Sequence, residues 1–453
     1  MLLFYFTIIL LYYIIKKTFI KSLKGRNIKK MKEKKVIGIN EKPPISQWIP
    51  LSIQHTFAMF SASVLVPVLV GIPASIVLLM NGIGTLLFMF VTKGKSPAYL
   101  GSSFAFLSPT FIVLAAEGLG YQYALGGFVV AGAIFALTGI IVKFVGVDWI
   151  DAVLPPAAMG PIVALIGLEL AGSAASTGQI LSVDGAPVDM ACVLVFVFTL
   201  GLAVIGQVVF KGFASAIAIL IAIVCGYGLA AVLGMVDFSP VTAAPLFELP
   251  AFSTPKFDLA AIIIIIPACL TVISEHISHQ IVTGQIVGKD LLRDPGLHRS
   301  MLADGLSTML SGLCGSVPTT TYGENIGVMA VTKVYSTWVI GGAAIFSIFL
   351  AFFGQVSALI NTIPGPVMGG ISFLLYGMIA ASGIRLLVDK QVDYSKPRNL
   401  AMTAVVFVTG LSGVAIQIGE VQLTGMCLAT IVGIVMGLAM FVIDKLGLAN
   451  DAE

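Results

Sequence analysis

The 453-residue chain is 58% hydrophobic and only 10% charged, and its mean hydropathy is +1.04. About a quarter of the residues of a soluble globular protein are charged, so this composition excludes a soluble fold and a disordered chain. It also excludes a secreted disulfide scaffold. The sequence instead predicts a polytopic helical membrane protein. Its apolar runs are too long for a β-barrel, whose strands alternate apolar and polar residues.

The five cysteines stand singly inside apolar segments, and none forms a CxxC pair. We interpret them as small core hydrophobes, with no disulfide and no metal implied. They are Cys192, Cys225, Cys269, Cys314 and Cys427.

The positive charge is concentrated at the N-terminus. Residues 1–42 hold 11 Lys and Arg against 2 Asp and Glu, while the remainder holds 14 basic and 20 acidic residues. Met1–Ile15 is almost wholly apolar and precedes the basic run, which is the wrong order for a signal peptide. Residues 1–34 are therefore predicted to be a basic extension. It is either an extra marginal helix or upstream sequence before a start at Met31.

Apolar runs and their boundaries predict fourteen membrane segments in the rest of the chain. Their starts are expected near residues 50, 74, 98, 121, 153, 190, 213, 258, 299, 318, 337, 363, 398 and 423. Every later cluster of Lys and Arg follows an even-numbered segment, and the first cluster precedes segment 1. Because basic loops remain on the cytoplasmic side, both termini are predicted to be cytoplasmic.

Two segments have an interrupted pattern of hydropathy. Pro97–Phe104 and Pro318–Asn325 each begin with Pro and continue with small or polar residues. They stand third in the first and in the second group of seven segments. Pro155–Ile162 and Pro364–Ile371 form a second matching pair, fifth in each group. Paired interrupted segments predict inverted repeats with a binding site between the broken helices. The alternative is that Pro and Gly are simply common in membrane helices.

Few ionisable side chains lie within the predicted segments, and such groups are usually functional. Segment 8 carries Glu275, His276 and His279, and Glu324 lies at the break in segment 10. Glu275 and His279 share one helix face, while His276 points about 100° away from Glu275. The other ionisable groups at membrane depth are His55, Glu169 and Asp304.

Three interpretations of the segment 8 cluster remain open. A metal site would need further ligands, and the sequence offers no other His or Cys cluster. His276 and His279 could instead extend toward the cytoplasmic loop at a helix end. In the third interpretation, Glu275 and His279 form a carboxylate–imidazole pair that takes up and releases a proton.

The broken segments add backbone donors to this site. A half-helix that begins near Phe104 or Gly323 leaves unpaired N–H groups and the positive end of its dipole in the core. Glu275 and Glu324 supply acceptors, and Phe104 and Tyr322 supply flat apolar surfaces. This set suits a planar ligand that alternates N–H and C=O groups, as a nucleobase does. Two carboxylates would repel a simple anion.

The segment Glu324–Lys333 has an acid, then Asn, a Gly two residues on and Thr-Lys five residues on. In this it resembles the nucleobase–ascorbate (nucleobase:cation symporter) family. The resemblance covers about residues 35 to 447 and is similar in detail to the family's bacterial uracil-transporting branch. The further segments that carry it are Pro97–Phe106, Pro155–Gly172, Glu275–His279, Lys289–Ser300 and Thr320–Thr332.

The resemblance implies an all-α polytopic membrane protein with fourteen transmembrane segments in two inverted repeats of seven. It implies a core domain (48–146 and 258–358) and a gate domain (150–235 and 361–447). A short strand would precede the half-helix in segments 3 and 10, and the two strands would pair antiparallel. Uptake of uracil with a proton, a plasma (inner) membrane location and a homodimer are also implied. No cofactor besides the proton is expected, and no nucleic-acid partner.

The resemblance also implies roles for individual residues. Glu275 and Glu324 would bind the ring N–H groups, and these two with His279 would couple the proton. The backbone N–H groups of Phe104 and Gly323 would bind the carbonyl oxygens. The remaining substrate-binding residues implied are Tyr322, Ala62 and Ser103.

Other functions remain as alternatives. A purine (xanthine or uric acid) transporter is the nearest one, although purine-transporting relatives tend to carry Gln at position 324 and Gly at position 333, where this chain has Glu324 and Lys333. An anion transporter on the same architecture is less favoured because of the buried carboxylates. An enzyme is not expected, because the sequence has no nucleophile elbow, metal spacing or phosphate loop.

Overall fold

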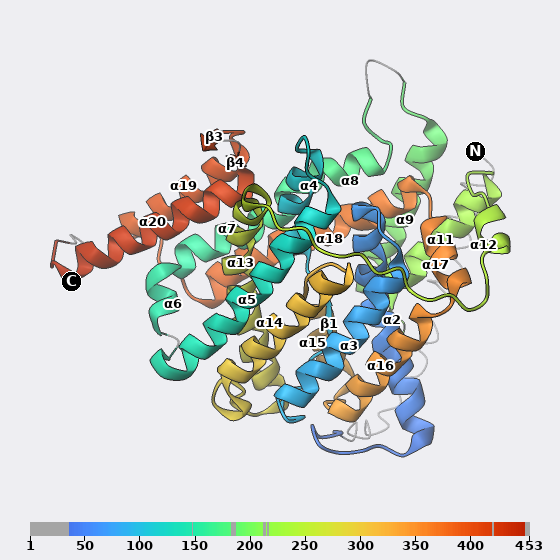
Figure 1. The fold of residues 1–453 in the computed structure, drawn as a ribbon, viewed down its shortest axis with the longest axis horizontal. Helices are drawn as coiled ribbons and strands as arrows, with labels where there is room; N and C mark the ends of the chain where they lie inside the picture. Colours follow the sequence, from blue (N-terminus) through green and yellow to red (C-terminus); the bar gives the residue numbers. More distant parts are fainter. Residues whose placement is uncertain are drawn as a thin grey trace, which may run out of the picture. The chain divides into compact units, whose positions relative to one another are not determined.

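The part of the chain that the structure describes is mostly helical (Figure 1). The computed structural model describes residues 36–146, 148–182, 187–211, 214, 217–418 and 421–448. The predicted N-terminal extension, residues 1–34, lies outside the described residues. The elements of the first half are α2 (Ile45–Val70), α3 (Ala74–Val91), β1 (Leu100–Ser102), η1 (Phe104–Phe106), α4 (Leu107–Ala115), α5 (Tyr121–Val145), α6 (Asp148–Val153), α7 (Pro156–Glu169), α8 (Ala171–Thr177), α9 (Met190–Val209) and α11 (Ala218–Val232).

The second half repeats this order of elements. After the short α12 (Ser239–Ala243) come α13 (Leu259–Val287), η2 (Leu292–Gly296), α14 (Leu297–Cys314), β2 (Thr319–Thr321), α15 (Gly323–Thr332), α16 (Thr337–Ala351), α17 (Gly354–Asn361), α18 (Gly365–Asp389), α19 (Pro397–Leu411), β3 (Ala415–Ile418), β4 (Val421–Thr424) and α20 (Gly425–Lys445). Each predicted segment starts within a few residues of a helix or of a strand that leads into one. The two strand–helix units, β1–η1–α4 and β2–α15, are the two segments predicted to be interrupted.

The number of membrane crossings is a separate question. Among the described residues, seven helices are long and apolar enough to span a bilayer, and the pair α16 and α17, bent by 85°, raises this to eight. The two broken units and several other helices are too short for the same test. A polytopic membrane protein is therefore confirmed, and the count of fourteen crossings stays a prediction.

The helices pack in two groups. The first helix group comprises α2, α3, α5, α13, α14 and α16, and the second comprises α7, α9, α11, α18, α19 and α20. In Figure 1, α5 lies beside α14, and α3 beside α16. The division of the chain into a core and a gate domain, and their separate movement, stay predictions.

The packing is symmetric under exchange of the two halves. Each helix of the first half corresponds to one of the second, so that α5 exchanges with α16 and α3 with α14. Exchanging the halves turns the pair α5–α14 into the pair α16–α3, and the helices of both pairs contact each other extensively. Likewise α9–α18 becomes α19–α7, and α11–α9 becomes α20–α19. Two repeats related by a twofold exchange would pack in this way.

Glycines allow α5 and α14 to approach closely. A Cβ atom added at Gly132 would lie 2.6 Å from the Gly305 carbonyl oxygen, and one added at Gly305 would lie 2.6 Å from the Gly132 carbonyl oxygen. Both clashes are with backbone, which cannot move aside as a side chain can. The crossing is a small-residue contact of the kind that drives helix association in membranes.

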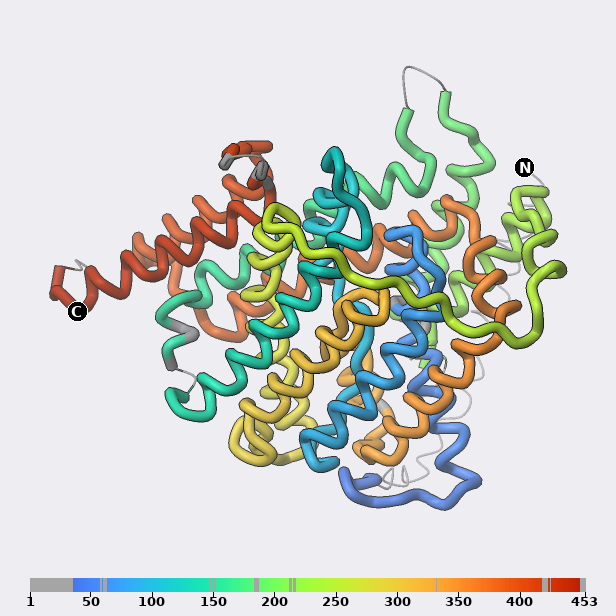
Figure 2. The backbone as a smooth tube through the Cα atoms, in the orientation of Figure 1, coloured from blue at the N-terminus to red at the C-terminus, as the bar shows by residue number. Residues whose placement is uncertain are grey.

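An extended connection crosses the ends of the first helix group (Figure 2). It runs from α12 to α13 and donates three backbone hydrogen bonds, from Glu248 to Phe352 (2.9 Å), from Ser253 to Cys314 (3.3 Å) and from Lys256 to Gln122 (2.8 Å). These acceptors lie at the ends of α16 and α14 and at the start of α5. The connection is therefore fastened to the first group.

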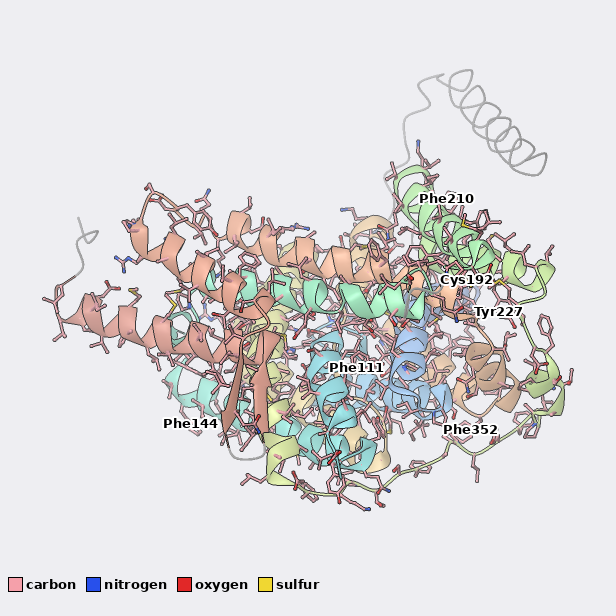
Figure 3. All side chains as sticks on the ribbon, turned by 90° about the horizontal axis from the view of Figure 1, so that it is seen from above. Phe111, Phe144, Cys192, Phe210, Tyr227 and Phe352 are labelled. Atoms are coloured by element: carbon pink, nitrogen blue, oxygen red, sulfur yellow. The ribbon has the colours of Figure 1, made fainter. Side chains whose placement is uncertain are left out.

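Large apolar side chains cover much of the outer surface. Phe144 is 77% exposed, Val208 81% and Val232 83%. Figure 3 labels Phe144 of α5 and Phe210, which follows α9, on two different sides of the helix array. Exposed apolar surface on this scale is costly in water and suits contact with lipid.

The cysteines are free, but their burial differs from the prediction in part. Cys192, Cys269 and Cys427 are buried, as expected for small core residues. Cys225 of α11 is exposed, so the core interpretation is wrong for it, and Cys314 is half-buried. α11 packs mainly on α9 and α18, which leaves the remaining faces of this apolar helix outside.

We expect Gly305→Ala to destabilise the protein by about 1–3 kcal/mol, because the added methyl group overpacks the α5–α14 crossing. The matched control is Gly201→Ala in α9, where an added Cβ meets no atom within 4 Å. The apparent unfolding temperature in detergent should fall for Gly305→Ala and stay unchanged or rise for Gly201→Ala. An equal effect of both substitutions would contradict the role given to the crossing.

Candidate functional site

The two broken segments meet through their strands. β1 and β2 pair antiparallel, with Leu100 opposite Thr321 and Ser102 opposite Thr319. The ladder continues at both ends, because Ser103 N–H donates to the Pro318 carbonyl (2.9 Å) and Tyr322 N–H to the Tyr99 carbonyl (3.1 Å). All six strand residues are buried. The pair thus satisfies the backbone polar groups of non-helical chain deep in the protein.

The next backbone donors point beyond the strands. Phe104 is the first residue of η1, and Gly323 is the first residue of α15. At the first position of a helix, helix geometry supplies no acceptor for the N–H group. The two donors predicted from the sequence therefore stand where the strand ladder has ended, at the positive ends of two short helices.

Glu275 and Glu324 come together at the start of α15. Glu275 lies midway along α13 and Glu324 in the first turn of α15, and both are half-buried. Glu275 is within electrostatic range of Glu324 and of Asp304. The structure thus brings the two predicted carboxylates within electrostatic range of each other. Their roles toward a ligand stay predictions.

His279 contacts this junction by a route that differs from the expected one. Its Nδ1 lies 3.1 Å from Thr321 Oγ1 on β2, whereas the sequence suggested a pair with Glu275. A Cβ added at Gly323 would lie 3.3 Å from His279 Nε2. The imidazole therefore sits against the N-terminus of α15, between the strand and the half-helix. Its pairing with Glu275 stays a prediction.

His276 faces another side of α13 and belongs to a buried polar cluster. It is 1% exposed, its Nε2 lies 3.0 Å from Ser300 Oγ, and its Nδ1 lies 3.0 Å from Asp304 Oδ2. The Nδ1 contact has the distance of an ion pair without the alignment of a hydrogen bond. The interpretation in which His276 extends toward the cytoplasmic loop is therefore wrong. Among the described residues, no group of three or more His, Cys, Asp or Glu side chains could hold a metal ion.

The aromatic walls come from three elements. The Tyr322 ring lies over Gly101, where a Cβ would overlap it, and its hydroxyl donates to the Ser102 carbonyl (2.9 Å). Phe104 meets Tyr376 of α18 edge to face at 6.3 Å. This contact joins the first broken segment to the second helix group.

Two buried hydroxyl groups next to predicted site residues in the sequence have no hydrogen-bond partner among the described residues. They belong to Ser103, which precedes Phe104, and to Ser274, which precedes Glu275. Buried polar atoms usually have a hydrogen-bond partner, so unpaired ones beside a candidate site are available to a ligand. Ser103 thus retains its predicted place at the site. Ala62 lies in α2, but its side chain is outside the described residues.

Sequence reasoning missed three members of this site. His55 Nδ1 of α2 lies 2.8 Å from Asn325 Oδ1 of α15 and so holds the half-helix against α2. Nothing in the sequence around Tyr376 or Gly101 indicated a place at the site. Lys333 lies at the far, C-terminal end of α15, where it is exposed. Any effect of Lys333 on ligand choice is therefore indirect.

A family model described as the permease family matches residues 46–419. The chain belongs to the permease family. Among its relatives are a uracil permease of Escherichia coli strain K12, 55% identical over 91% of this chain and 96% of the relative, and one of Paenibacillus larvae, 54% identical over 92% and 99%. A Bacillus subtilis uracil permease is 42% identical over 90% and 96%. As a permease family member, the protein is a transporter and not an enzyme.

Two solved structures share the fold of this permease. The transmembrane domain of the cyanobacterial bicarbonate transporter BicA aligns with a TM-score of 0.63 at 12% identity, over 89% of this chain and all of that domain. A murine solute carrier 26 family member A9 anion transporter in the inward-facing state aligns with a TM-score of 0.68 at 10% identity, over 89% and 69%. At such identity the likeness concerns the fold alone.

We expect the His276–Asp304 pair to behave as a unit in stability. His276→Leu should cost about 3–5 kcal/mol, because it leaves the buried Asp304 carboxylate with fewer partners. Adding Asp304→Leu should recover part of that loss. The measurement is the apparent unfolding temperature of the two single variants and the double variant, with Ser278→Ala, which removes a bond inside α13, as control. Strict additivity would show that the pair has no energetic coupling.

Proposed function

We propose that the protein takes up uracil across the plasma (inner) membrane together with protons, by alternating access. The observation that carries the proposal is the junction of β1, β2 and α13 in a chain 54–55% identical to uracil permeases over nearly its whole length. The multi-pass fold supports a membrane location. The proposal includes cytoplasmic termini, in line with the basic loops, and a homodimer.

The junction matches the edges of uracil. The pyrimidine ring carries two N–H donors and two carbonyl acceptors, alternating around a flat molecule. Carboxylates of Glu275 and Glu324 accept from the N–H groups, and the backbone N–H groups of Phe104 and Gly323 donate to the carbonyls. A ring bound in this way lies among the Phe104, Tyr322 and Tyr376 side chains. Polar groups of this kind fix orientation, while the apolar walls exclude water.

Protons would be carried by the same carboxylates. Two acidic groups in one enclosed site are more stable when one of them holds a proton, because two negative charges repel. Glu275 lies within electrostatic range of Glu324, and His279 contacts Thr321 and lies against Gly323, the residue before Glu324. Uracil binding would favour one protonation state of this cluster. The binding of uracil and the binding of a proton would thereby be coupled. No cofactor besides the proton is part of the proposal.

Alternating access would move the two helix groups against each other. The broken segments belong to the first group, since α4 packs on α2, α5 and α13, and α15 packs on α2 and α13. Tyr376 belongs to the second group. The Phe104–Tyr376 contact therefore spans the boundary at which the site would open and close.

An anion is a poor ligand for this site even though anion transporters share the fold. Glu275 and Glu324 lie within electrostatic range of each other, and even with one of them protonated the other would repel a bicarbonate or chloride ion bound at the backbone donors. A purine would present similar edges, but its second ring needs more space than uracil does. Competition by xanthine and uric acid in the uptake assay separates that alternative from uracil.

Radiolabelled uracil uptake in cells that lack their own permease tests the proposal. We expect uptake that rises with an inward proton gradient, falls when an uncoupler collapses it, and is blocked by unlabelled uracil. Glu275→Gln and Glu324→Gln should each lower the initial rate at least about tenfold, the effect of losing one charge-assisted hydrogen bond. Surface expression is measured in parallel.

The matched control is Glu117→Gln, an exposed carboxylate in the loop after α4, which should transport like the parent protein. If well-expressed protein takes up xanthine and not uracil, the assignment of uracil as the substrate is overturned. Gradient-independent uracil uptake would overturn the proton coupling alone.

Gly101→Ala should weaken uracil binding about tenfold or more, since the new methyl group must displace the Tyr322 ring from its place over β1. Gly327→Ala, in α15 with no atom within 4 Å of an added Cβ, is the control. Equilibrium binding of labelled uracil to purified protein gives both dissociation constants. Equal affinities for the two variants would show that the Tyr322 position does not matter to the ligand.

A further inference from the structure

Glu169 has no part in the site described above, yet its carboxylate joins three elements. It is the last residue of α7 and half-buried. Ser108 Oγ–H of α4 donates to its Oε2 at 2.9 Å, and the backbone N–H of Met426 in α20 lies 3.4 Å from each carboxylate oxygen. Both are donors, so the group that holds them must accept two hydrogen bonds.

The start of α20 is shaped to receive this carboxylate. Gly425, its first residue, has φ +51°, and a Cβ added there would overlap Glu169 Oε1. No residue but glycine leaves room for the oxygen. The negative group also lies at the positive end of a 21-residue helix, a favourable position for an anion. The contact of Glu169 with α20 therefore depends on Gly425, which is far from Glu169 in the sequence.

The contact joins the two helix groups. α4 packs on α2, α5 and α13 of the first group, whereas α7 and α20 pack on each other and on α19 of the second. Ser108 is one turn beyond Phe104, the residue whose N–H is offered to the ligand. The Ser108–Glu169 bond therefore fixes the half-helix of the site to helices that do not contribute a ligand-binding carboxylate.

We propose that Glu169 is a positioning residue that fastens the half-helix α4, through Ser108, to α7 and α20 in the conformation seen here. The inference rests on the proposed function in one respect, that the two helix groups move against each other during transport. The bond must break when α4 moves away from α7. Its strength thus sets how readily the junction of α4, α7 and α20 opens.

Cys427 provides a readout of that opening in the protein itself. It follows Met426 in α20 and is 4% exposed, and its thiol lies 3.9 Å from the Ile264 carbonyl of α13. Thiol labelling requires access to the sulfur, so its rate reports the fraction of time the junction is open. The other four cysteines are replaced by alanine, and labelling with N-ethylmaleimide is followed by mass spectrometry.

Glu169→Met keeps the side-chain length but has no acceptor oxygen. We expect Cys427 to be labelled about tenfold faster in this variant than in the parent. Ser108→Ala should do the same, and the double variant should label no faster than Glu169→Met alone. Ser108→Ala keeps the Glu169 side chain beside the thiol, so an acceleration shared by both substitutions does not depend on removing that carboxyl group. Glu169→Gln, which keeps one acceptor, should fall between the parent and Glu169→Met.

Matched controls separate this contact from general destabilisation. Glu117→Gln removes an exposed carboxylate near the end of α4, and Ser372→Ala removes a buried hydroxyl that bonds only within α18. Both should label at the parent rate. In a protein whose single cysteine is Cys269 of α13, 1% exposed, the Glu169 and Ser108 variants should leave labelling unchanged.

Uracil measurements distinguish positioning from binding. Glu169→Met and Ser108→Ala should keep the uracil dissociation constant within about threefold while the turnover number changes by a larger factor. Parent-like Cys427 labelling in Ser108→Ala, or equal acceleration at Cys269, would overturn the inference. Failure of the parent to transport uracil would overturn the proposed function instead, because the labelling comparison does not depend on the substrate.

Discussion

Backbone hydrogen bonding at membrane depth is the constraint on which this structure depends. Peptide groups that leave a helix within a bilayer need partners from the protein, because lipid offers none. β1 and β2 solve this for each other, with the ladder lengthened by Ser103–Pro318 and Tyr99–Tyr322. Neither broken segment could exist alone. The donors at Phe104 and Gly323, which we propose to face the ligand, are left over from this mutual pairing.

The two halves of the chain are therefore needed together at every level. The strand pair takes one strand from each half, and the extensive helix pairs α5–α14, α3–α16 and α7–α18 do the same. Glycines set the separation where two helices come closest, as at Gly132 and Gly305. The site lies where the halves meet. Its carboxylates come from the second half, while Phe104 and His55 come from the first.

Much of the architecture could be predicted because its signals are local. Proline followed by small and polar residues marks the two breaks, and apolar runs locate the helices. An acid in the first turn of a half-helix, such as Glu324, is a local signal too. Helix spacing places Glu275 and His279 on one face, but it cannot tell which neighbour supplies a partner. Thr321 could therefore be identified as the partner of His279 only from the structure.

Contacts between distant parts of the chain explain what the sequence did not reveal. Tyr322 fits because Gly101, on another strand, has no side chain. His55 meets Asn325 across 270 residues. Cys225 is exposed because few neighbours cover α11, although its own segment is as apolar as a buried one. In each case the deciding fact is which element packs opposite, and periodicity does not encode it.

The connection between α12 and α13 changes where the two helix groups divide along the chain. Its hydrogen bonds at Glu248, Ser253 and Lys256 fasten it to the ends of α16, α14 and α5. A rigid body is defined by its contacts, so this stretch belongs with the first helix group even though it lies before α13. α12 is fastened there too, because it packs on α17, which in turn packs on α2, α3 and α16. Along the chain, the division between the two helix groups therefore falls between α11 and α12, well upstream of α13.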